Sequence, residues 1–249
     1  MKWLPIASTL IVCSLSLPAN ANQSVEFDQD KFNAMLLTAL KENPEILREG
    51  FISLQALSKK EEEKKQIELL NQQSEAIFSN SSDPVLNALG TVPVAEFFDY
   101  RCGACKKVSN DMKTLVTEDN RVRMIYKDVA ILGPESEKLA KISIAVGIAN
   151  PNSYPAFHYG LMSMRSPNED YAYRLAKQLE LNVEEIQTLA AGKQVATKLA
   201  ENNRLFMTLK LKGTPSIYIG DTLIPGVVGL NTLKAKVDAA EKELLAKAN

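Results

Sequence analysis

Two cysteines, Cys102 and Cys105, are separated by Gly-Ala. Two thiols at this spacing can alternate between a dithiol and a disulfide, which is redox chemistry. The apolar, β-branched and aromatic run at residues 92–98 predicts a buried strand just before them. After Cys105, apolar residues recur at helical spacing. The pair is therefore predicted to lie where a strand leads into the first turn of a helix.

This position favours a reactive thiolate at Cys102. The unpaired backbone N–H groups and the macrodipole at a helix N-terminus stabilise a nearby anion. We therefore expect Cys102 to ionise more readily than a free cysteine. Cys105, one turn into the helix, is expected to face inward.

The cysteine count favours a redox role over a structural one. Besides the pair, the chain has only Cys13. A bridge across two intervening residues closes too short a loop to restrict the unfolded chain much. The alternative is half of a zinc site, which needs two further ligands, and the chain offers one histidine, His158, and no second Cys-x-x-Cys.

Residues 1–21 have the features of a secretory signal peptide. Lys2 supplies a positive start, residues 4–17 are mostly apolar, and Ala-Asn-Ala at 19–21 is a small-x-small cleavage site. Cys13 could indicate a lipoprotein signal, but Val12 before it is not small. We therefore expect cleavage after Ala21 and export to the periplasm, an oxidising compartment.

The charge balance does not point to a polyanionic partner. The chain has a net charge of −1, and loss of Lys2 with the signal peptide would leave −2. Neither nucleic acid nor an anionic membrane surface is implied as a partner.

Residues 22–82 predict a helical segment with its own apolar face. A first helix should start near Asp28 and end before Asn43, because Pro44 disfavours helix at its predecessor. Pro44 suits the first turn of a second, longer helix. Its apolar stripe is interrupted by a charged, solvated run at residues 59–65, and residues 79–84 form a turn-rich linker.

This helical segment has too few apolar partners of its own. It must pack either on the main domain or on another copy of itself, and we expect a homodimer. The predicted organisation is a signal peptide at 1–21, a helical dimerisation segment and linker at 22–82, and a catalytic domain at 83–249.

The remaining chain predicts an α/β domain. Strands at 92–98 and 122–129 flank the helix after Cys105 and form a parallel βαβ unit. Helical patterns fill about 135–211, a hairpin follows at 215–224, and a last helix spans 230–246. This is the layout of a thioredoxin-like fold with an inserted helical subdomain, preceded by the N-terminal helical segment.

Three segments resemble, in their order, the DsbA-like thiol-disulfide oxidoreductases of the thioredoxin superfamily, and the resemblance runs from about Val92 to the C-terminus. They are Glu-Phe-Phe-Asp-Tyr-x-Cys-Gly-Ala-Cys at 96–105, Lys-Asp-Val-Ala-Ile-Leu-Gly-Pro-Glu-Ser at 127–136, and Gly-Thr-Pro-Ser at 213–216.

The resemblance implies roles for further residues. Pro215 would be a cis-proline facing the active-site disulfide, and Thr214 before it would bind an extended substrate through its backbone. Glu96 would be the acidic residue buried beneath the active site, where it tunes or exchanges protons with Cys105. Lys127 is interpreted either as its counter-charge or as a solvated surface residue.

Two departures from the family pattern matter. Gly-Ala stands between the cysteines where strong oxidases have Pro-His, so we expect a less oxidising couple than in the family's most oxidising members. His158 lies in the insertion and is expected to pack between helices. Threonine before the cis-proline and an N-terminal extension look like the dimeric disulfide isomerases.

The sequence therefore predicts an exported enzyme that introduces or rearranges disulfide bonds in client proteins. Its expected partners are unfolded or wrongly bridged exported proteins and a membrane redox partner, and no cofactor is expected. The alternative is a holdase or a cuprous-ion-binding protein with the same fold, because soft thiolates suit that ion. No methionine-rich cluster accompanies the pair.

Overall fold

The computed structural model describes residues 28–248, which divide into two compact units between Ala56 and Leu57. The two units are described separately. No helix within the described range is both long and apolar enough to cross a membrane.

The first unit contains helix α1 (Gln29–Glu42) and the first part of helix α2 (Pro44–Phe78), the two helices expected at the N-terminus. Helix α1 begins where the Asp28 side chain accepts a hydrogen bond from the Lys31 N–H at 3.0 Å. Helix α2 starts at the proline, as predicted. The apolar side chains of these helices within the first unit are mostly exposed, among them Met35, Leu36, Leu37, Ile46, Leu47, Phe51, Ile52 and Leu54.

The second unit is built on one mixed sheet in the order β1-β3-β2-β4-β5. The strands are β1 (Val85–Leu86), β2 (Val92–Phe98), β3 (Val122–Asp128), β4 (Ser216–Ile219) and β5 (Thr222–Pro225). Strands β2 and β3 are parallel, and the other neighbours are antiparallel. The predicted βαβ unit and hairpin are confirmed, whereas the two-residue β1 was not predicted from the sequence.

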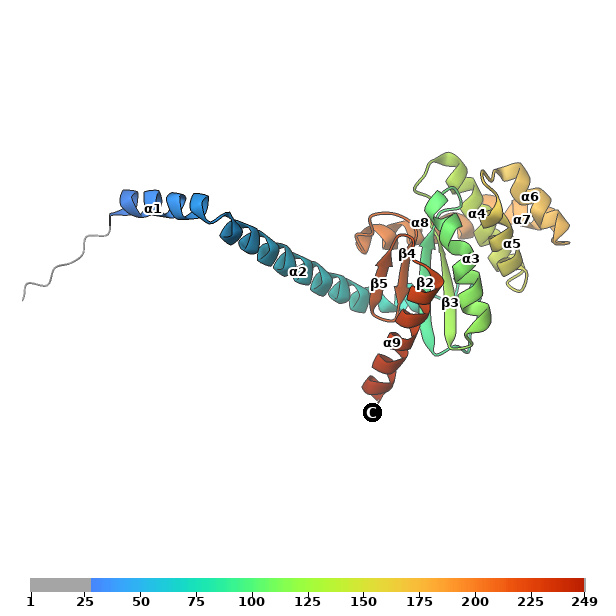
Figure 1. Ribbon diagram of the computed structural model, residues 1–249. Coiled ribbons are helices and arrows are strands. Elements are labelled where there is room, and N and C mark those ends of the chain that lie inside the picture. The colour runs from blue at the N-terminus through green and yellow to red at the C-terminus, as the bar shows by residue number, and fades with distance from the viewer. Residues whose placement is uncertain (1–27, 249) are drawn as a thin grey trace, which may run out of the picture. The chain divides into compact units, whose positions relative to one another are not determined.

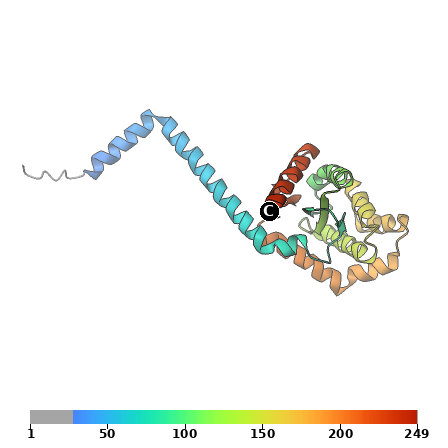
Figure 2. The same cartoon turned by 90° about the horizontal axis from the view of Figure 1, so that it is seen from below.

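Helices cover both faces of this sheet, as Figures 1 and 2 show. Helix α3 (Gly103–Glu118) connects β2 to β3, and α9 (Leu230–Ala248) follows β5. The predicted helical insertion consists of α4 (Pro134–Ala149), α5 (Tyr154–Ser163), α6 (Glu169–Gln178), α7 (Val183–Ala191) and α8 (Lys193–Thr208). The α/β fold class is therefore confirmed.

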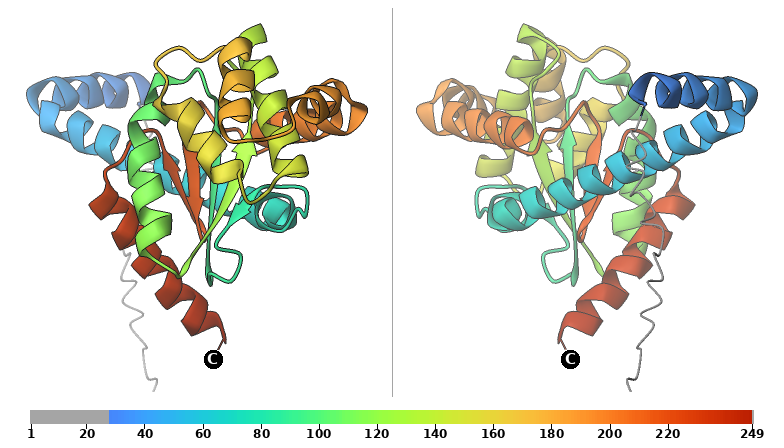
Figure 3. Two further views of the ribbon diagram at one scale, coloured as in Figure 1. Left: turned by 90° about the vertical axis from the view of Figure 1, so that its right-hand side faces the viewer. Right: turned by 90° about the vertical axis from the view of Figure 1, so that its left-hand side faces the viewer.

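Side chains of β2 alternate between two apolar cores. Val94 and Phe98 belong to the larger core, with α3 to α9, while Ala95 and Phe97 belong to the smaller one. The smaller core includes α8 and the end of α2, through Leu70, Ile77 and Phe78. In the right-hand view of Figure 3, the later part of α2 crosses in front of the sheet near α8. Residues 57–78 of α2 thus belong to the second unit.

Candidate active site

The two cysteines occupy the position that their sequence context predicts. Cys102 is the residue that precedes the first turn of α3, and its side chain is partly exposed. Its backbone N–H donates to the Asp99 carbonyl oxygen at 2.9 Å, which fixes the turn out of β2. Cys105 lies in the first turn of α3 and is fully buried. The structure contains both residues as free thiols.

The loop before β4 brings Thr214 and Pro215 against Cys102. The Thr214–Pro215 peptide bond is cis, as expected. The thiol of Cys102 donates to the Thr214 carbonyl oxygen with an Sγ to O distance of 3.1 Å. The Pro215 carbonyl oxygen accepts from the Gly226 N–H at 2.8 Å, so the loop is held from the β5 side. Residues more than a hundred positions apart thus form one site.

The surroundings of Cys102 favour its thiolate. Burial alone would raise the pKa of this thiol, but hydrogen bonds from the Thr214 side chain and from the Cys105 and Ala104 backbone lower it below its ordinary value. The backbone N–H groups are those of the first turn of α3, which is the origin of the effect expected at a helix N-terminus. Of the two thiols, that of Cys102 has the lower pKa.

Cys105 has the opposite environment. Burial raises the pKa of its thiol well above the usual range, and the charge of Glu96 raises it further. Glu96 itself is fully buried in β2, and burial raises the pKa of its carboxyl to about 8. The sequence-based expectation of a buried acid near Cys105 agrees with this environment.

Asp99 is a site residue that the sequence analysis did not assign. Its buried carboxylate accepts hydrogen bonds from the backbone N–H of Arg101 at 2.8 Å and from the Ser136 hydroxyl at 2.8 Å. It also accepts from the N–H groups of Ile131 and Leu132 at 3.0 and 3.2 Å. Asp99 therefore ties the turn before Cys102 to the loop after β3. In the sequence, the signal for Asp99 was a charged residue directly after the apolar run at residues 92–98.

Lys106 is a second residue that was not assigned from the sequence. Its Nζ donates to the Tyr100 carbonyl oxygen. Partial burial lowers the pKa of the ammonium group, while the charges of Cys105, Asp99 and Cys102 act in the opposite direction. Lys106 thus places a positive charge close to both thiols. In the sequence, the signal for Lys106 was its position directly after the cysteine pair.

Both interpretations of Lys127 are wrong. Its side chain is fully buried, so it is not a solvated surface residue. It pairs in the sheet with Phe97, on the face opposite to Glu96, so it is not the counter-charge of Glu96. Its Nζ instead forms an ion pair with Asp83 from the segment after α2. Asp83 also pairs with Lys198 of α8.

His158 lies in the core, in agreement with the expectation that it packs between helices. It is 1% exposed, and its Nδ1 lies 3.0 Å from the Tyr100 hydroxyl among a group of aromatic rings. Burial lowers its pKa to about 3, so the ring is neutral near pH 7. The expected signal peptide and Cys13 lie outside the described residues.

This chain is similar to a known protein family and to proteins of known structure. The family model of the DSBA-like thioredoxin domain matches residues 93–238, which include both cysteines and Pro215. Disulfide bond formation protein D from Bacillus subtilis (strain 168) is 25% identical over 167 residues, 63% of this chain and 74% of that protein.

Two solved structures extend the comparison. A thioredoxin-like oxidoreductase from Silicibacter pomeroyi DSS-3 is 34% identical, with a TM-score of 0.63 over 68% of this chain and 97% of the other. Proteus mirabilis ScsC in a transitional conformation is 26% identical, with a TM-score of 0.64 over 88% of this chain and 97% of the other. The second match reaches beyond the residues that the family model covers.

Proposed function

The chain belongs to the DSBA-like thioredoxin domain family, and from this premise we propose that it introduces and rearranges disulfide bonds in exported client proteins. The observation that supports this most is the contrast between the two thiols. Cys102 is accessible, has a lowered pKa and contacts the Thr214 carbonyl, whereas Cys105 is buried with a raised pKa. Such a pair has one attacking and one resolving sulfur.

In the oxidase direction, the enzyme starts with a Cys102–Cys105 disulfide. A client thiolate attacks Cys102 Sγ, the bond between the two enzyme sulfurs breaks, and Cys105 takes the electron pair and a proton. A second client thiolate attacks the client sulfur of the mixed disulfide, and Cys102 leaves as a thiolate. Its lowered pKa makes Cys102 the better leaving group. Two electrons pass to the enzyme, and the client gains one disulfide.

In the isomerase direction, the reduced enzyme starts the reaction. The Cys102 thiolate attacks a wrong client disulfide and releases one client thiolate, which then attacks another client disulfide. The client thiolate that is released last attacks the client sulfur of the mixed disulfide, and Cys102 leaves as a thiolate. If this rearrangement stalls, Cys105 attacks the mixed disulfide and releases the client in reduced form. When the rearrangement succeeds, neither the enzyme nor the client has gained or lost electrons.

We assign the surrounding residues to two tasks. Glu96, whose pKa of about 8 keeps its carboxyl protonated near neutral pH, supplies the proton that Cys105 takes up. Thr214 and Pro215 present a backbone edge to the client chain beside the reacting sulfur. Because this chemistry passes only electrons and protons between sulfurs, no cofactor is required.

The proposed compartment is the periplasm, with residues 1–21 as a cleaved signal peptide. The support is the sequence pattern of that segment and the oxidising conditions that disulfide formation needs. A membrane redox partner would reoxidise Cys102 and Cys105 after oxidase turnover, or reduce them for isomerase work.

We further propose a homodimer formed through the first unit. Eight large apolar side chains of α1 and the first part of α2 are each at least 46% exposed, from Leu36 at 46% to Met35 at 73%. A second copy offers a matching apolar face, and association would remove both faces from water. Two catalytic units held in one assembly would suit wrongly bridged clients.

Turnover of two clients tests the activity. The full chain should oxidise a reduced client and should reactivate scrambled ribonuclease, while Cys102→Ser should do neither. Suppression of client aggregation is measured with both proteins. If neither protein oxidises or reactivates a client and both suppress aggregation equally, the protein acts as a holdase and the enzyme proposal is wrong.

Solution mass tests the assembly. Leu47→Glu with Leu54→Glu should convert the dimer to a monomer and reduce ribonuclease reactivation more than client oxidation. The control, Glu49→Lys with Ala56→Lys, places two charges at exposed positions about 160° around the same helix from Leu47 and Leu54 and should leave the mass unchanged. Deletion of residues 22–82 is less suitable, because Leu70, Ile77 and Phe78 belong to the core of the second unit. A monomeric wild type would contradict the proposal.

A further inference from the structure

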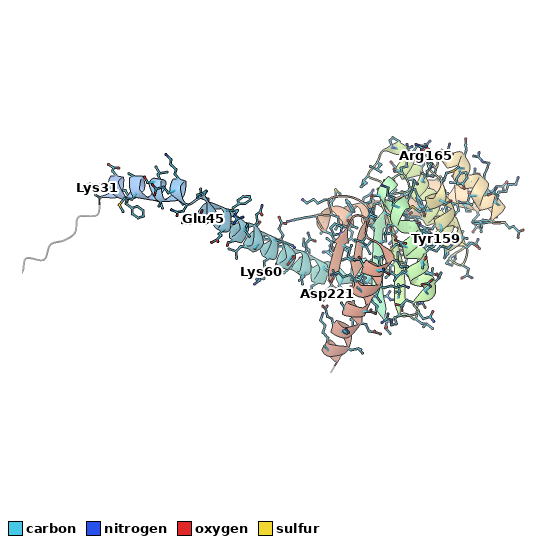
Figure 4. The ribbon with its side chains drawn as sticks, viewed as in Figure 1. Lys31, Glu45, Lys60, Tyr159, Arg165 and Asp221 are labelled. Atoms are coloured by element: carbon cyan, nitrogen blue, oxygen red, sulfur yellow. The ribbon has the colours of Figure 1, made fainter. Side chains whose placement is uncertain are left out.

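A long groove starts at the active-site loop of the second unit. One hollow of about 660 Å³ lies between α2, the loop that contains Thr214 and Pro215, and β5. A second hollow of about 510 Å³ lies further along α2 and the β4–β5 hairpin. Glu62, Gln66 and Leu223 line both hollows, so they form one continuous groove, hereafter the α2 groove. Asp221, which lines the second hollow, is labelled in Figure 4.

The α2 groove has an apolar floor with two unpartnered polar atoms. Leu69, Leu211 and Leu223 form the floor of the first hollow. The polar atoms are Gln66 Oε1 and the hydroxyl of Tyr218, which is 1% exposed, and neither has a hydrogen-bond partner within residues 28–248. Buried polar atoms normally have partners. An amide N–H of a bound chain would supply one to Gln66 Oε1.

The rim of the first hollow is basic. Lys65, Lys210 and Lys212 line it together with one acidic residue, Glu62. None of the three lysines forms an ion pair with another described residue. The positive rim lies at the end of the groove that contains Thr214, next to the Cys102 thiol. An acidic ligand segment would complement it.

The groove suits an extended chain in size and position. Its larger hollow falls within the range of about 300–1,000 Å³ that is typical of ligand sites. Strand β5 is an edge strand of the sheet, and edge strands are common sites for extended peptides. Thr214 lines the groove and contacts Cys102, so the groove opens beside the sulfur that a client cysteine would reach.

We propose that the α2 groove binds the client segment beside the reacting cysteine, and that it selects an apolar residue flanked by acidic ones. This inference rests on the proposed function, because it names the substrate class of the same site. Helix α2 is then a wall of the substrate site as well as the connection to the first unit. Selectivity for clients comes partly from Lys65 and Lys212.

Peptide thiols test the proposal with the oxidised full-length protein. Two acidic peptides each contain one cysteine and a Glu-Leu-Glu segment, which precedes the cysteine in one peptide and follows it in the other. Two lysine peptides have the same design with Lys-Leu-Lys in place of Glu-Leu-Glu. Acid quenching and mass spectrometry give the rate at which each peptide reduces the Cys102–Cys105 disulfide. We expect the better acidic peptide to react about fivefold faster than its lysine partner at low salt.

Charge reversal on the rim provides the decisive comparison. Lys65→Glu with Lys212→Glu should abolish or invert the preference for the acidic peptide. The control, Lys177→Glu with Lys193→Glu, changes the net charge by the same amount at exposed lysines outside the groove. This variant should retain the preference for the acidic peptide. An equal loss in both variants, or no preference in the wild type, overturns the proposal.

Reduction by dithiothreitol separates this proposal from the proposed function. The small thiol does not occupy the groove, so the control variant, Lys177→Glu with Lys193→Glu, should react with it at the wild-type rate. For Lys65→Glu with Lys212→Glu, each peptide rate is divided by the rate with dithiothreitol, so that the ratio reports on the groove and not on the reactivity of the disulfide. If the wild type reacts with dithiothreitol, and reacts equally fast with the acidic peptide and its lysine partner, the groove proposal fails and the redox function stands. If the wild type reacts with neither peptides nor dithiothreitol, the proposed function itself fails.

Discussion

The thiol of Cys102 lies 3.1 Å from the carbonyl oxygen of Thr214, a residue 112 positions later in the chain. This contact joins the start of α3 to the loop before β4. The two elements are held together because β2 and β4 are neighbours in the sheet, with Phe97 opposite Ser216. The acidity of the reactive thiol therefore depends on a residue outside the cysteine motif.

Thr214→Val should raise the pKa of Cys102. The hydrogen bond from the Thr214 side chain is the largest of the effects that lower this pKa, and valine retains the shape without the hydroxyl. The pH dependence of iodoacetamide alkylation measures the change. Below its pKa, a thiol loses reactivity tenfold per pH unit, so the whole profile should move to higher pH.

Ser216→Ala is the matched control for that experiment. It removes a hydroxyl from the other side of Pro215, where Ser216 Oγ donates to the Gly213 carbonyl oxygen at 2.7 Å and does not contact Cys102. Its alkylation profile should coincide with that of the wild type. Equal shifts in both variants would mean that the loop conformation, and not the Thr214 hydroxyl, sets the pKa.

Glu96→Gln should change how stability depends on pH. The carboxyl has a pKa of about 8 in the folded protein and an ordinary value of 4.5 when unfolded. Between these values only the folded state retains the proton, so the free energy of unfolding falls as pH rises, by up to about 1.4 kcal/mol per pH unit. This contribution is fully present below pH 4.5 and lost above pH 8. Glutamine removes it.

Urea unfolding at several pH values from 4.5 to 8.5 measures this effect. Relative to the wild type, Glu96→Gln should gain stability as pH rises through that window and then stay level. Asp128, whose pKa is raised to about 7 by burial, is present in both proteins, so the difference between them reports on Glu96. A constant difference at all pH values would show that the Glu96 carboxyl titrates normally.

Asp99→Asn should destabilise the protein by about 2–4 kcal/mol. The carboxylate accepts four hydrogen bonds, and an amide has one acceptor oxygen and an NH₂ group that would face backbone donors. Urea unfolding measures the loss. Asp111→Asn, at a half-buried position of α3, should change stability little; a similar loss in both would contradict the anchoring role of Asp99.

The sequence was sufficient for features that depend on local pattern. The strand before Cys102 and the helix after Cys105 follow from periodicity within a few residues. The cis-proline at 215 was implied by the resemblance to the DsbA-like family, and the structure has that bond in the cis form. Strand β1 has only two residues, too few for any periodic pattern.

Features that depend on register and distant partners were not predictable. Whether Lys127 faces Glu96 or the opposite core is decided by which residues of β2 and β3 are paired. Its partner Asp83 is 44 positions earlier, in a segment that the sequence indicated only as a linker. The division of α2 between two units has the same cause, because its apolar residues look alike along the helix.

Asp83→Asn should destabilise the protein more than Lys127→Met. The buried carboxylate of Asp83 is paired with both Lys127 and Lys198, so its loss leaves two lysines without a counter-charge. Removal of one partner from a buried ion pair typically costs about 3–5 kcal/mol. Lys127→Met keeps the pair between Asp83 and Lys198 and supplies an apolar side chain of similar length. Urea unfolding at pH 7 compares the two, and a smaller loss in Asp83→Asn would contradict this arrangement.

Ala104→His should make the protein a stronger oxidant. No histidine is among the groups that lower the pKa of Cys102, and an imidazolium at position 104 would stabilise its thiolate further. A more stable reduced form gives a less negative reduction potential, by about 30 mV for each tenfold change in the equilibrium constant. Equilibration with glutathione buffers measures it. Ala104→Gln adds a neutral side chain of similar size and should leave the potential near that of the wild type, so equal shifts in both variants would exclude the charge as the cause.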